Sequence, residues 1–117
     1  MPLVDFSRDI ALDAVAAVAA YASLHSANPG STGANEIAGG TPAYARQAVT
    51  WDPASGSVVS FDGTPVVFDM QGGDTVAYGG LWDSLSGGNW IGGDAVTNFA
   101  PAGQSTYTLT VISITAT

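Results

Sequence analysis

The second half of the chain is divided into short runs of β-branched and aromatic residues, and this pattern restricts the fold more than any other feature. From Tyr44 onward, six or seven such runs are separated by turns rich in glycine, proline and aspartate. Short strands at this spacing are typical of antiparallel sheets packed face to face. We therefore predict a mainly β protein: an antiparallel β-sandwich, jelly-roll or Ig-like, of about seven to eight strands, preceded by one N-terminal helix.

The strongest hairpin signal is Asp62-Gly63. A type I′ turn needs positive φ at both central residues, and an Asp-Gly pair accepts that geometry. The sequence thus predicts that residues 57–61 and 64–68 pair with each other across this turn.

Two glycine pairs interrupt the next runs. Gly79-Gly80 lies inside a strand expected at residues 75–82 and indicates a bend or the close approach of another backbone. Gly92-Gly93 follows Trp90 and is expected to close a short strand or a wide turn there.

The C-terminal run, residues 105–117, is predicted to be the clearest strand. Tyr107, Leu109 and Val111 alternate with threonines, but the apolar face then changes side, because Ile112 and Ile114 fall on the threonine face. Either a bulge resets the direction, or the helix or a neighbouring subunit covers both faces. In both cases this end of the strand should not be freely solvated.

The N-terminal part of the chain should form the helix and a long loop within one domain, residues 1–117. Residues 6–20 are alanine-rich and free of glycine and proline, so they favour a helix. Asp5 or Ser7 is expected to cap its first N–H groups. The β-sandwich should then span residues 21–117, with a long loop at residues 28–43, where glycine and proline support turns.

Composition excludes several classes of function. The 117 residues include ten acidic side chains but only two basic ones, Arg8 and Arg46, giving a net charge of −8. A nucleic acid is therefore an improbable partner, because almost no cation is present to neutralise phosphates. The absence of cysteine excludes disulfide and zinc-thiolate scaffolds. The apolar run at residues 10–24 is too short for a membrane span, and no secretory signal is recognisable, so synthesis in the cytoplasm is expected.

The charged fraction is only 10%, whereas 46% of the residues are hydrophobic. So few charges leave apolar surface that a neighbouring molecule is expected to cover.

No residue pattern predicts an enzyme, a cofactor or a metal. His25 is the only histidine, so a transition-metal site would have to consist of carboxylates and one imidazole. No G-x-S-x-G motif accompanies it, although a hydrolase of the bacterial envelope with His25 as its base is one alternative. The scattered aspartates are expected to stabilise turns.

The three tryptophans suggest an alternative function for the protein, as a module that binds carbohydrates of the host surface. An exposed indole can stack on a sugar ring while nearby polar groups bind its hydroxyls. Against this, tryptophans of β-sandwiches more often fill the core or an interface. The candidate platform consists of Trp51, Trp82 and Trp90.

Four sequence segments carry a resemblance to a known class of proteins. They are ASLHSANPG at residues 22–30, TGANEI at 32–37, YARQAVTW at 44–51 and GLWD at 80–83. With these segments the chain resembles small tail-fibre-like or minor tail proteins of tailed bacteriophages that infect actinobacteria, and similar β-domains serve as head-decoration proteins. The resemblance implies a non-enzymatic structural component that is made in the host cytoplasm and resides in the virion.

Such a component would dock on other virion proteins, the major capsid or tail proteins, as a homo-oligomer or in many copies. Asn35 and Glu36 would then either pair with an arginine of the partner or hold the long loop to Arg46 and to its own backbone. The candidate docking residues are Phe6, Ile10, Val15, Asn35, Glu36, Ile37, Ile112 and Ile114.

Overall fold

The computed structural model describes residues 1–110 and 112–115. One helix, α1 (Asp5–Val18), precedes eight strands. The strands are β1 (Tyr21–His25), β2 (Gln47–Ala48), β3 (Val58–Ser60), β4 (Val66–Met70), β5 (Val76–Trp82), β6 (Trp90–Phe99), β7 (Ser105–Leu109) and β8 (Ser113–Thr115). Their pairings are antiparallel. The prediction of a mainly β, antiparallel fold with one N-terminal helix is thus confirmed.

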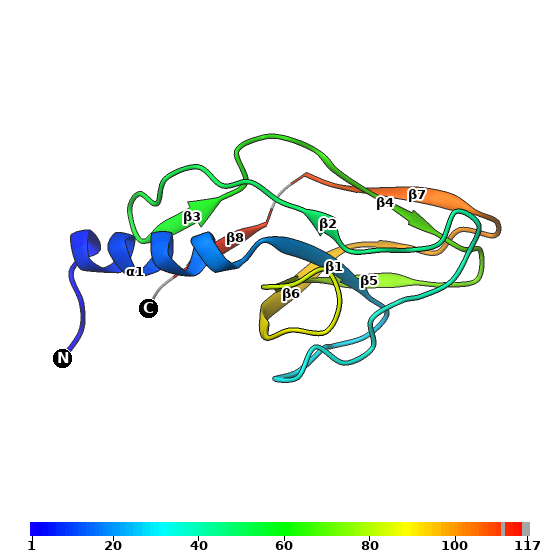
Figure 1. Ribbon diagram of the computed structural model, residues 1–117, viewed down its shortest axis with the longest axis horizontal. Coiled ribbons are helices and arrows are strands. Elements are labelled where there is room, and N and C mark those ends of the chain that lie inside the picture. The colour runs from blue at the N-terminus through cyan, green and yellow to red at the C-terminus, as the bar shows by residue number, and fades with distance from the viewer. Residues whose placement is uncertain (111, 116–117) are drawn as a thin grey trace.

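The strands form one larger sheet and two ribbons. The sheet has the order β2-β1-β5-β6, and the ribbons are β3-β8 and β4-β7. Leu24 and Val76 from the sheet pack in one core with Phe68 and Met70 from the β4-β7 ribbon, and all four are fully buried. Burying each such side chain stabilises the fold by about 1.5–3 kcal/mol. The molecule measures 48 × 27 × 23 Å, and α1 extends from one end beside β3 (Figure 1).

The predicted hairpin at Asp62-Gly63 is wrong, because the segments on either side of it enter different ribbons. β3 pairs with β8, whereas β4 pairs with β7. The amide N–H of Thr64 donates to the Asp62 carboxylate at 2.9 Å, and only Gly63 of the pair has positive φ. Asp62 therefore forms a turn with its own side chain, which does not fold the strands back on each other.

The type I′ geometry occurs one turn earlier in the chain. Gly56 and Ser57 have φ values of 59° and 66°, and the backbones of Ser55 and Val58 exchange two hydrogen bonds across them. We call this turn, residues 54–58, the Gly56 turn. It lies against α1, and its residues donate hydrogen bonds to the helix, as described below.

The predicted C-terminal strand is divided into two strands that belong to different ribbons. β7 pairs with β4 and β8 pairs with β3, while Val111, at the expected change of face, lies outside the described residues, as do residues 116–117. Leu109 and Ile112 are both in the core although they are three positions apart. An uninterrupted strand would place them on opposite faces. The expectation that this end is not freely solvated is confirmed for Ile112, which is buried.

The glycine pairs belong to one long strand pairing instead of a turn. β6 continues through Gly92-Gly93, and Gly80 faces Gly93 across the β5–β6 ladder. A Cβ atom on Gly80 would lie 2.3 Å from the Trp90 ring, so these glycines make room for an indole on the sheet. The sequence indicated the close approach of another backbone at Gly79-Gly80, whereas the group that approaches Gly80 is the side chain of Trp90.

Substituting Gly80 should therefore cost more stability than substituting a glycine nearby. We expect Gly80→Ala to lower the free energy of unfolding by about 2–3 kcal/mol, because the added methyl group must displace Trp90. Gly92→Ala in β6 is the matched control, since a Cβ there meets no atom within 4 Å. Urea denaturation compares the two variants, and equal costs would contradict this packing.

Candidate functional site

The long loop is held by an ion pair between Glu36 and Arg46. The guanidinium donates from Nε to Oε2 and from Nη2 to Oε1, both at 3.0 Å. Only 9% of the Arg46 side chain and 22% of the Glu36 side chain are exposed. Two parallel charge-assisted hydrogen bonds in a partly buried place fix both position and direction of the loop.

Arg46 also joins a second loop and the sheet. Its Nη1 donates to the carbonyls of Ser84 and Gly87 at 2.9 and 2.8 Å, and its guanidinium carbon lies 3.8 Å from the centre of the Trp82 ring. The planar cation is thus stacked on an indole while its N–H groups are bound in the plane. One side chain connects residues 28–43, residues 83–89 and β5.

Tyr44 completes the anchoring of Glu36. Its hydroxyl donates to Glu36 Oε2 at 2.7 Å and accepts the backbone N–H of Leu24 at 3.0 Å. Burial, followed by the hydrogen bond to Glu36, raises the pKa of Tyr44 far above its usual value. The phenol therefore stays protonated and keeps donating.

Beneath this pair, a chain of hydrogen bonds passes through His25. A carbonyl can only accept, so His25 Nδ1 donates to the oxygen of Ala34 at 2.8 Å, and Nε2 accepts from the Ser23 hydroxyl at 2.7 Å. Ser23 Oγ in turn accepts from the indole N–H of Trp82 at 3.0 Å. Burial lowers the pKa of His25, which favours the neutral ring that this chain requires.

The Ser23–His25 contact has the length of a nucleophile–base pair, but its surroundings are those of a packed core. Both side chains have no exposed surface, and Trp90 covers the imidazole edge to face at 5.2 Å between ring centres. The group beyond Nδ1 is the Ala34 carbonyl instead of a carboxylate. In this arrangement a substrate has no access to Ser23 Oγ. The hydrogen bond from His25 to Ala34 connects β1 to the loop.

The three tryptophans do not share one surface. Trp82 is buried and contacts Trp90 at 5.2 Å between ring centres, whereas Trp51 packs on Phe61. Each indole N–H is bound inside the molecule, to Ser23 Oγ and to the carbonyls of Gly30 and Ala19. Sugar binding by these residues stays a prediction, and their observed contacts are those of packing residues.

The aspartates of α1 accept hydrogen bonds from the Gly56 turn. Asp9 accepts the backbone N–H of Ser57 and Asp13 accepts that of Ala54, both at 2.8 Å, while Asp5 accepts the Ser57 hydroxyl at 2.7 Å. The expected cap by Asp5 or Ser7 is wrong: the N-cap position is Val4, with no side-chain hydrogen bond, because Asp5 is bound to the Gly56 turn. Arg8 pairs with Asp5 at 3.1 Å.

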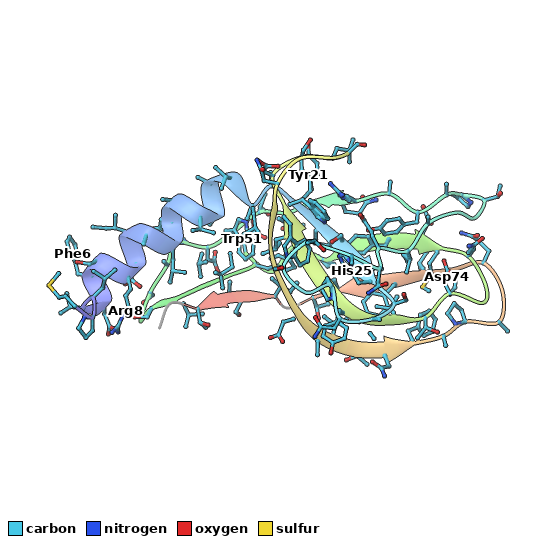
Figure 2. The ribbon with its side chains drawn as sticks, turned by 90° about the horizontal axis from the view of Figure 1, so that it is seen from below. Phe6, Arg8, Tyr21, His25, Trp51 and Asp74 are labelled. Carbon is cyan, nitrogen blue, oxygen red and sulfur yellow. The ribbon has the colours of Figure 1, made fainter. Side chains whose placement is uncertain are left out.

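The opposite face of α1 is apolar and exposed. Phe6, Ile10 and Val18 are 74%, 57% and 54% exposed, and Leu12 is the only buried residue of the helix. Figure 2 shows Phe6 at the end of α1 far from the sheets and Trp51 beside the other end. We call the surface formed by Phe6, Ile10, Ala14, Ala17 and Val18 the outer face of α1. Asp13, which is also exposed, lies at its edge beside Ala17.

The predicted docking residues are distributed over several environments. Phe6 and Ile10 lie together on the outer face, and Val15 and Ile114 are partly buried. Ile37 and Ile112 belong to the core, so their side chains contribute no free surface. Glu36 is bound to Arg46, as described above, and Asn35 donates to the backbone of Asn28 at 3.1 Å. Of the two predicted roles for this pair, holding the loop is the one observed.

The role of the three helix aspartates was missed, although the sequence contains its signal. Asp5, Asp9 and Asp13 are spaced by four positions, which places them on one face of a helix. Nothing local shows what this face binds, because its partners, two backbone N–H groups and one hydroxyl, belong to Ala54 and Ser57.

Comparison with known proteins identifies one family. The model of the family described as Gp80, podophage GP4 fiber I protein gp80, matches residues 7–115. The match confirms the resemblance to phage tail-fibre proteins, and the actinobacterial host stays a prediction. No curated protein matches the chain.

Among residues 1–110 and 112–115, no helix is long and apolar enough to cross a membrane. The same residues contain no group of three or more His, Asp or Glu side chains placed to hold a metal ion.

Removing the charge of Glu36 should loosen the long loop. We expect Glu36→Gln to lower the free energy of unfolding by about 1–3 kcal/mol, because it leaves the Arg46 cation largely buried without its counter-ion. Amide hydrogen exchange should accelerate in residues 28–43 and 83–89. Asp52→Asn, at an exposed carboxylate, is the control with the same chemical change. Unaltered exchange in both loops would count against this anchoring role.

Acidification should destabilise the protein through His25. Its pKa is lowered from 6.5 in the folded state, so below pH 6.5 the unfolded chain takes up a proton that the folded chain resists. The free energy of unfolding should therefore fall as the pH drops through 6.5. His25→Asn retains an N–H for Ala34 and should show a smaller difference between urea denaturation at about pH 7.5 and 5.5. If the free energy of unfolding changed equally between the two pH values in both proteins, His25 would not be the group responsible.

Proposed function

Because the chain belongs to the family of podophage GP4 fiber I protein gp80, we propose that it is a non-enzymatic structural subunit of a phage tail fibre, held in the particle through the outer face of α1. The family name favours the tail fibre over head decoration. The proposed location is the virion, after synthesis in the host cytoplasm.

The observation that carries this proposal is the orientation of α1. In most surface helices the apolar side faces the core and the charged side faces water. Here Asp5, Asp9 and Asp13 bind the Gly56 turn, while Phe6 and Ile10 face outward. Burying Phe6 and Ile10 against another polypeptide would contribute about 1.5–3 kcal/mol each. A fibre multiplies such contacts, since repeated copies retain one another more strongly than one contact does.

The contacts around His25 support a structural role for the rest of the molecule. The only histidine is bound between Ser23 and Ala34 with no exposed surface. The one partly buried ion pair, among the residues that the structure describes, connects loops to the sheet. Both arrangements stiffen the body that carries the helix.

The double variant Phe6→Ser/Ile10→Ser tests the docking role. Both side chains are exposed, so the folded protein should retain its melting temperature, whereas assembled particles should contain at least about tenfold fewer copies of it. Mass spectrometry of purified particles measures the copy number. The control is Leu85→Ser, which removes a side chain of similar exposure to Ile10, 54% against 57%, from a different part of the surface.

Normal incorporation of the double variant would exclude the outer face as the docking surface. Equal loss with Leu85→Ser would mean that docking is not specific to α1. Catalytic turnover by the purified protein, abolished by Ser23→Ala, would overturn the non-enzymatic role.

A further inference from the structure

We propose that two of the protein's own side chains, Asp94 and Tyr107, close the free edge of β6 against the addition of a further strand. The surface that they protect is the backbone of β6, and the partner that it fits is an extended polypeptide with unpaired N–H and C=O groups. In a solution of the purified protein, that partner is a second copy of the chain. This role is separate from the proposed docking through α1.

β6 forms one edge of the larger sheet and is long enough to bind another strand. It is the longest strand that the structure describes, with ten residues, and β5 is its only partner in the described sheet order. None of its residues is buried. An edge of this length presents a row of backbone groups to which another chain can add. By contrast, β2 at the opposite edge has two residues.

Two grooves leave this edge open along its length. One, with a volume of about 720 Å³, lies between residues 95–99 of β6 and residues 106–110. The other, of about 500 Å³, is lined by residues 91–96 of β6 and residues 112–115. β7 and β8 are paired with β4 and β3 and not with β6. The strands that border the grooves therefore leave the edge of β6 without a partner.

β6 carries few of the residues that commonly protect an edge. Its sequence, WIGGDAVTNF, has no lysine and no proline, and Asp94 is its only charged residue. Its register with β5 shifts between the pairs Val76–Phe99 and Tyr78–Ala95, which is the irregularity of a β-bulge. A bulge leaves backbone groups without ladder partners, so this part of β6 has groups that a new strand could bind.

Tyr107 occupies one of these groups from across the first groove. Its hydroxyl donates to the carbonyl oxygen of Thr97 at 2.8 Å, and its ring centre lies 6.1 Å from that of Phe99. The residue belongs to the core and is 9% exposed, so the hydroxyl is held in place. Burial raises the pKa of Tyr107, which keeps the hydroxyl protonated as the donor. An incoming strand would have to displace this hydrogen bond before it could bind Thr97.

Asp94 occupies a second backbone group nearby. Its Oδ1 accepts the backbone N–H of Ala95 at 2.8 Å. Both residues are exposed, so the carboxylate stands at the open edge. Two copies paired along β6 would also bring their carboxylates into one interface, and like charges on paired strands are destabilising. A test of the hydrogen bond must therefore keep the change in charge the same in its control.

The test compares two double variants made in the Phe6→Ser/Ile10→Ser protein, which lacks the apolar side chains proposed for docking. Asp94→Ala/Tyr107→Phe removes both hydrogen bonds but retains the ring in the core. Asp94→Asn/Tyr21→Phe is the matched control: it also loses one negative charge and one phenol hydroxyl, while the amide oxygen still accepts the N–H and Tyr107 is unchanged. Sedimentation velocity at about 200 µM should show dimers and larger species for the first variant, with a dissociation constant at least about tenfold lower than that of the control.

Amide hydrogen exchange locates the new contact. In the associated variant, residues 93–99 should exchange at least about tenfold more slowly than in the control, because an added strand binds and covers their backbone groups. Residues 47–48, at the opposite edge of the sheet, should exchange equally in both proteins. Protection that appeared elsewhere and not in β6 would overturn the proposal.

The single variant Asp94→Ala keeps the proposal falsifiable if Tyr107→Phe weakens the core. It changes one exposed side chain, and its dissociation constant should still be at least about threefold lower than that of Asp94→Asn. A double variant that is folded by circular dichroism and stays monomeric at about 200 µM would overturn the proposal. Equal association of the control would assign the protection to charge and would overturn the two hydrogen bonds as its cause.

Discussion

The partly buried pair of Glu36 and Arg46 determines the organisation of the body more than any other interaction. The sixteen-residue loop is rich in glycine and proline, and its regular contact with the sheet is one β-bridge between Glu36 and His25. The pair fixes the loop, and the loop in turn supplies the carbonyl of Ala34 that orients His25. Because Arg46 also stacks on Trp82, the charge is placed where solvent competes little for its hydrogen bonds.

The glycines of the sheet make room for the side chain of Trp90. Trp90 lies flat against strands that would exclude an indole if Gly80 or Gly93 had a side chain. The three large rings of His25, Trp82 and Trp90 then pack edge to face beneath the long loop. The body is consequently tightly packed where β5, β6 and the loop meet.

At the other end, α1 is attached by polar contacts. Asp9 and Asp13 accept backbone N–H groups of the Gly56 turn and Asp5 accepts the Ser57 hydroxyl, so hydrogen bonds to charged groups hold the helix together with the burial of Leu12. The apolar side of Phe6, Ile10 and Val18 is thereby left exposed. This exposed surface is the basis of the docking role proposed above.

The sequence alone determined the mainly β class, the N-terminal helix and the long loop. It also offered the pairing of Glu36 with Arg46 as one of two alternatives. These features follow from the local composition and from the spacing of apolar residues, and both are properties of short stretches of sequence. The sequence did not determine that Asp62-Gly63 joins two ribbons, that β7 and β8 belong to different ribbons, or that Asp5, Asp9 and Asp13 bind the Gly56 turn. Each of these depends on which distant backbone groups meet, and that choice is made when the whole core packs, because antiparallel strands gain similar hydrogen bonds from many possible partners.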